Sequence, residues 1–179
     1  MAGLLLLGAC ENDLKKVKAI SEQQLKNPAD SSKGVEVIFS DSAKVKLRLT
    51  APLMLQYSSV AKPYMEMPRG VKAVFFNDSL KEITTITADY GWRRESEKLI
   101  VLRKNVVATN QKGDVFKSDE LVWNEATRKV TSSKPVTIVT SNGSVINGSS
   151  LLTNEKFDPW EINATTGIFH VDHDLNSQQ

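Results

Sequence analysis

The sequence predicts an all-β fold assembled from strand-pair repeats of about 30 residues. β-Branched residues are abundant, with 17 Val, 9 Ile and 12 Thr among 179 residues, and such residues favour strands. From Val35 onward, short apolar runs alternate with clusters of turn residues. The near balance of 23 Lys and Arg against 21 Asp and Glu disfavours nucleic-acid binding through a basic surface.

The first nine residues are typical of a secretory signal peptide, because they are uncharged and small residues follow the Leu4–Leu7 run. Leu7-Gly8-Ala9-Cys10 resembles the bacterial lipobox, in which the chain is cut before a cysteine that then carries lipid. We therefore expect Cys10 to be a lipid anchor. Basic residues are missing before the apolar run, so residues 1–9 are expected to be an incomplete signal peptide. The alternative is an ordinary buried cysteine.

Residues 10–34 are expected to form the lipidated N-terminus and a flexible tether, because they are mostly polar and include Asn27-Pro28. The alternative is a short helix, since Leu14, Val17 and Ile20 would share one helical face. A tether of this length would allow the folded part to stand off a membrane.

The folded domain is predicted to span residues 35–171, with residues 172–179 as a tail. Its strands are separated by sequences rich in turn-forming residues, among them Phe76–Ser79, Arg94–Glu97, Gln111–Asp114 and Ser141–Ser144. The Asn-Gly pair in the last of these is favoured in type I′ hairpins.

A shift of 30 positions aligns several segments of the chain. Gly113-Asp114-Val115-Phe116 falls on Gly143-Ser144-Val145-Ile146, and Glu95, Glu125 and Glu155 also align. Two strands and two turns fit into one such unit, so each repeat is predicted to be a strand pair stacked on the next.

Because the period is even, aligned residues point to the same side of their strands. Even-numbered apolar positions are predicted to line one interior, and the candidates are Ile86, Ala88, Tyr90, Ile100, Leu102, Val106, Phe116, Val122, Val136, Ile138 and Ile146. Odd positions such as Arg93, Lys117 and Glu125 are predicted to be on the polar side. Leu121 and Trp123 are odd and apolar, so some strands are covered on both faces or bulges change the phase.

Four segments follow one another along the chain: Lys44-Val-Lys-Leu-Arg-Leu-Thr-Ala-Pro52, Ile86-Thr-Ala-Asp-Tyr90, Val115-Phe-Lys-Ser-Asp-Glu-Leu-Val-Trp123 and Gly143-Ser-Val-Ile-Asn-Gly-Ser-Ser-Leu151. In this order they resemble the LptC family, the periplasmic component of the lipopolysaccharide export system. More broadly, they are similar to the OstA-like repeat that LptC shares with its soluble partner LptA. The resemblance implies an open β-jellyroll, without catalytic activity, whose interior holds the acyl chains of lipopolysaccharide. We expect no cofactor and no metal.

The resemblance also implies partners at both ends of the jellyroll. Subunits of an inner-membrane ABC transporter, of the LptF/LptG type, would meet the N-terminal end, and an LptA-like periplasmic protein would meet the C-terminal end. Exposed edge strands can pair with another chain; the candidate edge residues are Val35, Val37, Phe39, Ile168, Phe169 and Val171. Relatives have an N-terminal transmembrane helix, whereas this chain shows a lipobox. We expect a periplasmic protein held by its lipid at the inner membrane.

The residues alone leave a second function open, an extracytoplasmic β-sandwich lipoprotein with a closed core that binds a glycan or a protein partner. The densest basic stretch is either a solvated face or a contact for lipid phosphates; it comprises Arg93, Arg94, Lys98, Arg103 and Lys104.

The two histidines are not expected to form a metal or catalytic site. His170 and His173 would face opposite sides of a strand. The sequence contains no Gly-x-Ser-x-Gly elbow for a nucleophile. We therefore interpret this segment, together with Asp172 and Asp174, as a solvated tail.

Overall fold

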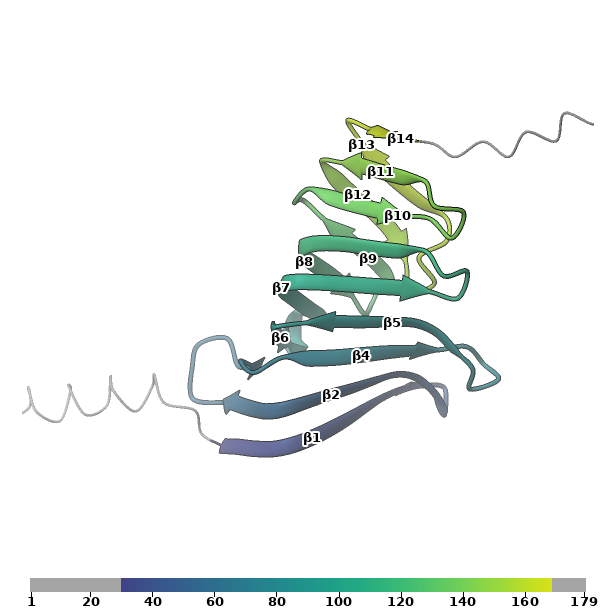
Figure 1. Ribbon diagram of the computed structural model, residues 1–179. Helices are drawn as coiled ribbons and strands as arrows, with labels where there is room; N and C mark the ends of the chain where they lie inside the picture. The colour runs from purple at the N-terminus through teal and green to yellow at the C-terminus, as the bar shows by residue number, and fades with distance from the viewer. Residues whose placement is uncertain (1–29, 169–179) are drawn as a thin grey trace, which may run out of the picture.

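The computed structural model describes residues 30–168, which form one continuous antiparallel sheet of 14 strands folded on itself (Figure 1). The strands are β1 (Asp30–Asp41), β2 (Lys44–Tyr57), β3 (Tyr64–Met67), β4 (Val71–Phe76), β5 (Glu82–Ala88), β6 (Tyr90–Arg94), β7 (Leu99–Asn110), β8 (Val115–Asn124), β9 (Lys129–Ser132), β10 (Val136–Val139), β11 (Val145–Gly148), β12 (Ser150–Asn154), β13 (Trp160–Asn163) and β14 (Thr166–Ile168). The only helical element in this range is a short 3₁₀ turn, η1 (Glu95–Glu97). The predicted all-β, jellyroll-like fold is confirmed, although β1 begins before the predicted boundary at Val35.

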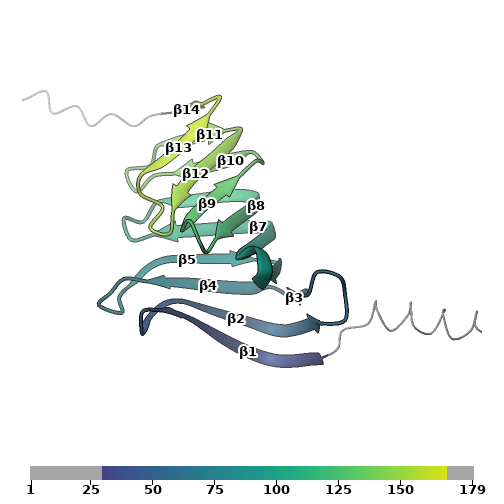
Figure 2. The same cartoon turned by 180° about the vertical axis from the view of Figure 1, so that it is seen from behind.

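Four long strands pass between two layers of the fold. β2, β7 and β8 each pair with different neighbours along their length, and β1 pairs with both parts of β2. The first layer contains β4, β5, β10, β11 and β14 with one part of each long strand. The second layer contains β3, β6, β9, β12 and β13 with the remaining parts. Strands stack from the β1 end to the β13 and β14 end, as the reverse view also shows (Figure 2).

A bulge in β7 changes which residues face the interior. Lys104 and Asn105 have φ angles of 64° and 48°, and the pairing with β8 slips between Arg103 and Val106. β8 shows the consequence, because Phe116 is buried in its first half whereas Leu121 and Trp123 are buried in its second half. The anticipated change of phase is confirmed for the second half of β8, which buries odd positions, whereas even positions are buried again at Val130, Val136, Ile138 and Ile146.

β6 also departs from the even-numbered rule. Gly91 and Arg93 are buried, whereas Tyr90 and Trp92 are only partly buried. A Cβ atom added to Gly91 would meet core side chains of Val71, Leu102 and Met67, so the odd positions of β6 face inward. The prediction that Arg93 lies on the polar outer side is therefore wrong.

The 30-residue repeat is visible in the turns of both layers. In the first turn row (residues 77–81, 110–114 and 140–144), the residues with positive φ are Leu80, Gly113 and Gly143. Their amides donate to the carbonyl three residues earlier. In the second turn row (residues 95–98, 125–128 and 154–157), the residues with positive φ are Lys98, Arg128 and Phe157.

The hairpin at Ser141–Ser144 is not of type I′. A type I′ turn needs positive φ at both central residues, but the backbone has positive φ only at Gly143 within this segment. The Gly143 amide donates to Thr140, and the Thr140 amide donates to Ser144. This pattern is typical of a type I turn followed by a glycine bulge.

The first layer ends in an unpaired strand edge on each side. Within residues 30–168, β1 pairs only with β2, and β14 pairs only with β11. The β14 backbone lies so close to β11 that a Cβ added to Gly167 would come within 2.5 Å of the Val145 carbonyl oxygen. In the same range, no helix is long and apolar enough to cross a membrane.

Candidate functional site

The predicted interior residues are brought together between the two layers, with two exceptions. Nine of the eleven are buried there: Ile86, Ala88, Ile100, Leu102, Val106, Phe116, Val136, Ile138 and Ile146. Phe116 packs against Phe157 and Trp160, with ring centroids 4.9 and 6.4 Å apart. Side chains therefore fill the interior in this structure.

Tyr90 and Val122 lie on the outer side of their strands, which corrects the expectation that they face the interior. The Tyr90 hydroxyl donates to Glu66 Oε1 at 2.7 Å. Burial and the neighbouring Glu66 carboxylate raise the pKa of Tyr90. Val122 is only partly buried, and its neighbours Leu121 and Trp123 belong to the core.

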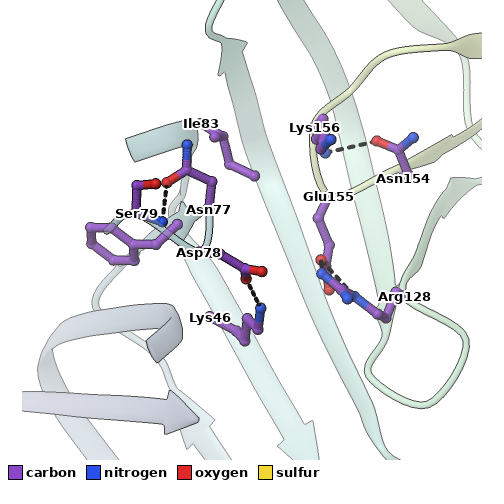
Figure 3. A pocket seen from close by; sticks show the side chains of 10 residues that line it. Lys46, Asn77, Asp78, Ser79, Ile83, Arg128, Asn154, Glu155 and Lys156 are labelled. Carbon is purple, nitrogen blue, oxygen red and sulfur yellow. Dashed lines mark hydrogen bonds and ion pairs between the residues drawn. The ribbon is translucent and has the colours of Figure 1, made fainter. Parts of the chain in front are cut away.

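The two turn rows face each other across a lateral opening of the sandwich, which we call the seam. A cavity of about 600 Å³ lies in its middle. Asn77–Ser79 of the first turn row lines one side, and Arg128, Glu155 and Lys156 line the other (Figure 3). Lys46 of β2 lies on the same side of the cavity as Asp78.

Two smaller cavities continue the seam in both directions. One of about 380 Å³ shares Lys46, Arg128 and Glu155 with the central cavity and reaches Arg93 and Trp123. Another of about 160 Å³ shares Asn77, Ile83 and Lys156 with it and reaches Lys112 and Asp158. None of the three is lined by a predicted interior residue.

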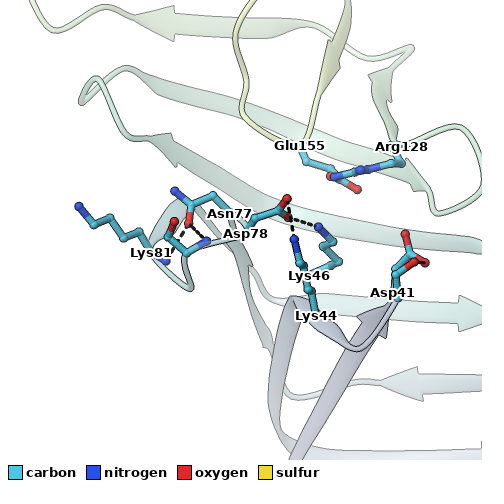
Figure 4. Close-up of polar contacts among 10 residues, drawn as sticks. Asp41, Lys44, Lys46, Asn77, Asp78, Lys81, Arg128 and Glu155 are labelled. Carbon is cyan, nitrogen blue, oxygen red and sulfur yellow. Dashed lines mark hydrogen bonds and ion pairs between the residues drawn. The ribbon is translucent and has the colours of Figure 1, made fainter.

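Carboxylates on both sides of the central cavity hold basic side chains in place. Asp78 accepts hydrogen bonds from Lys46 at 2.5 Å and Lys44 at 3.2 Å (Figure 4). These two bonds lower the pKa of Asp78, Lys46 contributing most. Across the cavity, the Glu155 carboxylate binds Arg128 at 2.9 and 2.5 Å and raises the pKa of Arg128.

Contacts close the seam on both sides of the central cavity. Toward the C-terminal end, Lys112 of the first layer forms an ion pair with Asp158 of the second at 2.7 Å. The Asn110 side chain also donates to the Phe157 carbonyl at 3.3 Å. Toward the N-terminal end, the Arg93 guanidinium lies 4.7 Å from the centroid of the Phe39 ring.

The basic stretch singled out in the sequence does not form one surface. Arg93 points inward, Arg94 pairs with Glu97, and Arg103 pairs with Glu120. Lys104 lies 6.0 Å from the Tyr90 ring. Of these five residues, Lys98 and Arg93 line the seam.

Sequence reasoning missed Lys46, Arg128 and Lys156 as a group, because they are separated along the chain and come from three different elements. A shift of 30 positions would have placed Arg128 on Lys98, and both are the positive-φ residues of their turns.

The predicted edge residues are only partly described. Val35, Val37 and Phe39 are half-buried in β1, and 72 % of Ile168 is exposed in β14. Phe169 and Val171 lie outside the described residues, as do Cys10 and the segment from His170 to Asp174. Within residues 30–168, no group of three or more His, Cys, Asp or Glu side chains could hold a metal ion.

The outer face of the second layer carries an aromatic cluster. Tyr57 and Tyr64 stack with ring centroids 4.5 Å apart, and Arg94 lies 4.9 Å from the ring centroid of Trp92. Flat aromatic surfaces of this kind can bind sugars or proteins.

A family model described as LptC, lipopolysaccharide-assembly, LptC-related, matches residues 4–158. No curated protein matches the chain.

Proposed function

The chain belongs to the LptC-related family of lipopolysaccharide-assembly proteins, and we propose that it is a membrane-tethered periplasmic bridge for lipopolysaccharide. Members of this family take part in lipopolysaccharide transport. They are periplasmic and associated with the inner membrane. On this proposal, the protein accepts lipopolysaccharide from an ABC transporter and passes it on by binding alone, without catalysis.

The observation that carries the proposal is the apolar interior between two layers of repeated strands. Each methylene group moved out of water contributes about 0.8 kcal/mol, so a lipid-transfer protein must shield the acyl chains. Buried side chains such as Phe116, Val136 and Ile138 come from strands that pair side by side. They offer a continuous apolar wall along the stacking direction.

Acyl chains would have to replace contacts that the side chains now make with one another. Phe116, Phe157 and Trp160 occupy the C-terminal part of the interior. The two layers must therefore move apart or repack when lipid binds. The long strands that join the layers would act as the hinge, because the bulge at Lys104 and Asn105 already bends β7.

The strand edges fit the proposed partners. β1 would add to a transporter subunit of the LptF/LptG type, and β14 would add to an LptA-like protein. Lipid on Cys10 would hold the protein at the inner membrane, provided that more than one acyl chain is attached.

The proposal is tested by photo-crosslinking in cells that make lipopolysaccharide. A crosslinker at Phe116, Val136 or Ile138 is expected to capture lipopolysaccharide, because these side chains face the interior. Lys117 is the matched control, since it neighbours Phe116 but is exposed. Equal capture at Phe116 and Lys117 would argue against the interior site. Glu125 is unsuitable as an outer control because it lines the seam.

The aromatic cluster favours a second candidate function, binding of a glycan or protein on the outer face with a closed core. Tyr57 and Tyr64 supply the stacked surface. Co-purification distinguishes the two candidates. Lipopolysaccharide together with transporter subunits supports the bridge, whereas a lipid-free protein whose glycan affinity is lost in Tyr57→Ala and Tyr64→Ala supports the second.

A further inference from the structure

We propose that Lys46, Lys98, Arg128 and Lys156 along the seam bind phosphate groups on the headgroup of an acylated glycolipid whose chains lie between the two layers. This inference rests on the proposed function, because it assigns the polar part of the same ligand to the opening of the same interior. It also differs from the contact considered from the sequence, since three of the four residues lie outside that basic stretch.

The basic residues are spaced along the stacking direction of the strands. Lys98 and Arg128 close equivalent turns, with φ angles of 53° and 57°. Their hairpins, β6–β7 and β8–β9, are neighbours in the second layer. Adjacent strands lie about 4.8 Å apart, so equivalent positions in successive hairpins are about 10 Å apart. Lys156 follows in the next turn of the same row. A headgroup moving along the seam would therefore meet a cation at each repeat.

The pairing of charges leaves room for an anion. Within residues 30–168, neither Lys98 nor Lys156 has a carboxylate at ion-pair distance. The carboxylates beside them are already engaged, Asp78 with two lysines and Glu155 with Arg128. Asp41 lines the 380 Å³ cavity that Lys98 also lines, and its carboxylate would repel an anion there. A bound cation would have to compete with arginine and lysine side chains for the Asp78 and Glu155 carboxylates. A phosphate would instead meet the unpaired ammonium groups of Lys98 and Lys156.

A second, independent observation is an unpartnered donor beside the seam. Trp123 is only 8 % exposed, and among the described residues its indole N–H has no hydrogen-bond partner. Trp123 lines the same cavity as Lys98 and packs against Phe75 in the core. It therefore marks the boundary between the charged opening and the apolar interior. An unsatisfied buried donor is costly, and an ester carbonyl between headgroup and acyl chain is an acceptor that could satisfy it.

The test compares lipopolysaccharide with the same lipid after removal of its phosphates, bound to the full-length protein at low salt. We expect Lys98→Ser with Lys156→Ser to weaken binding of the phosphorylated lipid about tenfold and to leave the dephosphorylated lipid unaffected. Lys72→Ser with Lys117→Ser is the matched control, because both lysines are exposed on the outer side of the first layer. The loss is expected to shrink as salt is raised.

The possible outcomes separate this inference from the proposed function. If wild-type protein binds neither lipid, the proposed function fails. If it binds both equally, or if both double variants lose the same affinity, the seam does not bind the headgroup and the interior site survives. Inorganic phosphate is the third probe. If inorganic phosphate displaces the lipid with an affinity equal to that of the whole lipid, the seam is a site for free phosphate. That result would overturn the headgroup assignment.

Discussion

Arg93 and Glu125 form a two-point ion pair that joins β6 to the turn after β8. Arg93 Nε donates to Glu125 Oε1 at 2.7 Å, and Nη2 donates to Oε2 at 3.1 Å. Their side chains are only 10 % and 14 % exposed. The same guanidinium lies over the Phe39 ring, so this pair also ties β1 to the second layer across the seam.

Removing the carboxylate of this pair is expected to destabilise the fold. Glu125→Gln leaves the buried Arg93 guanidinium with the Phe39 ring and Glu95, whose carboxylate is 3.8 Å away. Breaking a buried pair costs about 3–5 kcal/mol, and these remaining contacts reduce the expected loss to about 2 kcal/mol. Urea unfolding measures it.

Glu82→Gln is the control for that measurement, because the Arg48–Glu82 pair is much more exposed, at 39 % and 55 %. We expect a change below about 0.5 kcal/mol there. Equal losses in the two variants would contradict a special role for the Arg93–Glu125 pair.

Arg93 also illustrates what could be predicted from sequence. Alternation and the 30-residue shift predict strands, turns and most interior residues, because side-chain direction follows from a period of two as long as the strand is regular. Lys104 and Asn105 interrupt that regularity with positive φ, and nothing in their types announces it. The seam could not be predicted either, because its residues meet only through packing of the two layers.

The repeat predicts a stabilising substitution at Leu80. This residue is 62 % exposed and has a φ of 58°, whereas its equivalents Gly113 and Gly143 are glycines. The left-handed conformation costs a residue with a Cβ about 1 kcal/mol, so Leu80→Gly is expected to raise the free energy of unfolding by about 0.5–1 kcal/mol. Thermal unfolding measures the gain.

Ser79→Gly is the control for the turn, because Ser79 does not have positive φ. Glycine there adds freedom to the unfolded chain and is expected to lower stability slightly. Destabilisation by Leu80→Gly would show that side-chain contacts of Leu80 outweigh its backbone strain.

The ion pairs of the Asp78 carboxylate are expected to make the stability of the fold sensitive to acid. In the folded state, Lys46 and Lys44 lower the pKa of Asp78 below its ordinary value of 3.8. The stability that the ionised Asp78 carboxylate contributes is therefore present above pH 3.8, and it is lost as pH falls through the lower pKa of the folded state. Asp78→Asn removes this contribution. We expect the wild type to be more stable than the variant at pH 7 and this advantage to shrink as pH falls below 3.8, as measured by urea unfolding at each pH. A difference that persists unchanged at pH 2 would contradict the linkage.

Gly167→Ala is expected to separate β14 from β11, because the added Cβ would lie 2.5 Å from the Val145 carbonyl oxygen. β14 is short and exposed, so stability should change by less than about 1 kcal/mol. Hydrogen exchange at Thr166–Ile168 should increase, and capture of an LptA-like partner should be lost if it adds to this edge. Thr165→Ala, outside the strand, should leave both unchanged. Retained capture by Gly167→Ala would place the partner elsewhere.

The contacts across the seam predict how acyl chains reach the interior. Lys112 and Asp158 belong to opposite layers and form an ion pair at 2.7 Å, with 61 % and 46 % of their side chains exposed. An exposed pair contributes at most about 1 kcal/mol, so it can open readily. In a Cys10→Ser background, a thiol-reactive linker between Lys112→Cys and Asp158→Cys should hold the seam closed and block lipopolysaccharide uptake. A linker between Arg48→Cys and Glu82→Cys, which both belong to the first layer and line none of the seam cavities, should leave uptake unchanged. If the linker across the seam also leaves uptake unchanged, acyl chains must enter through an end of the sandwich, because only that route avoids parting the two turn rows.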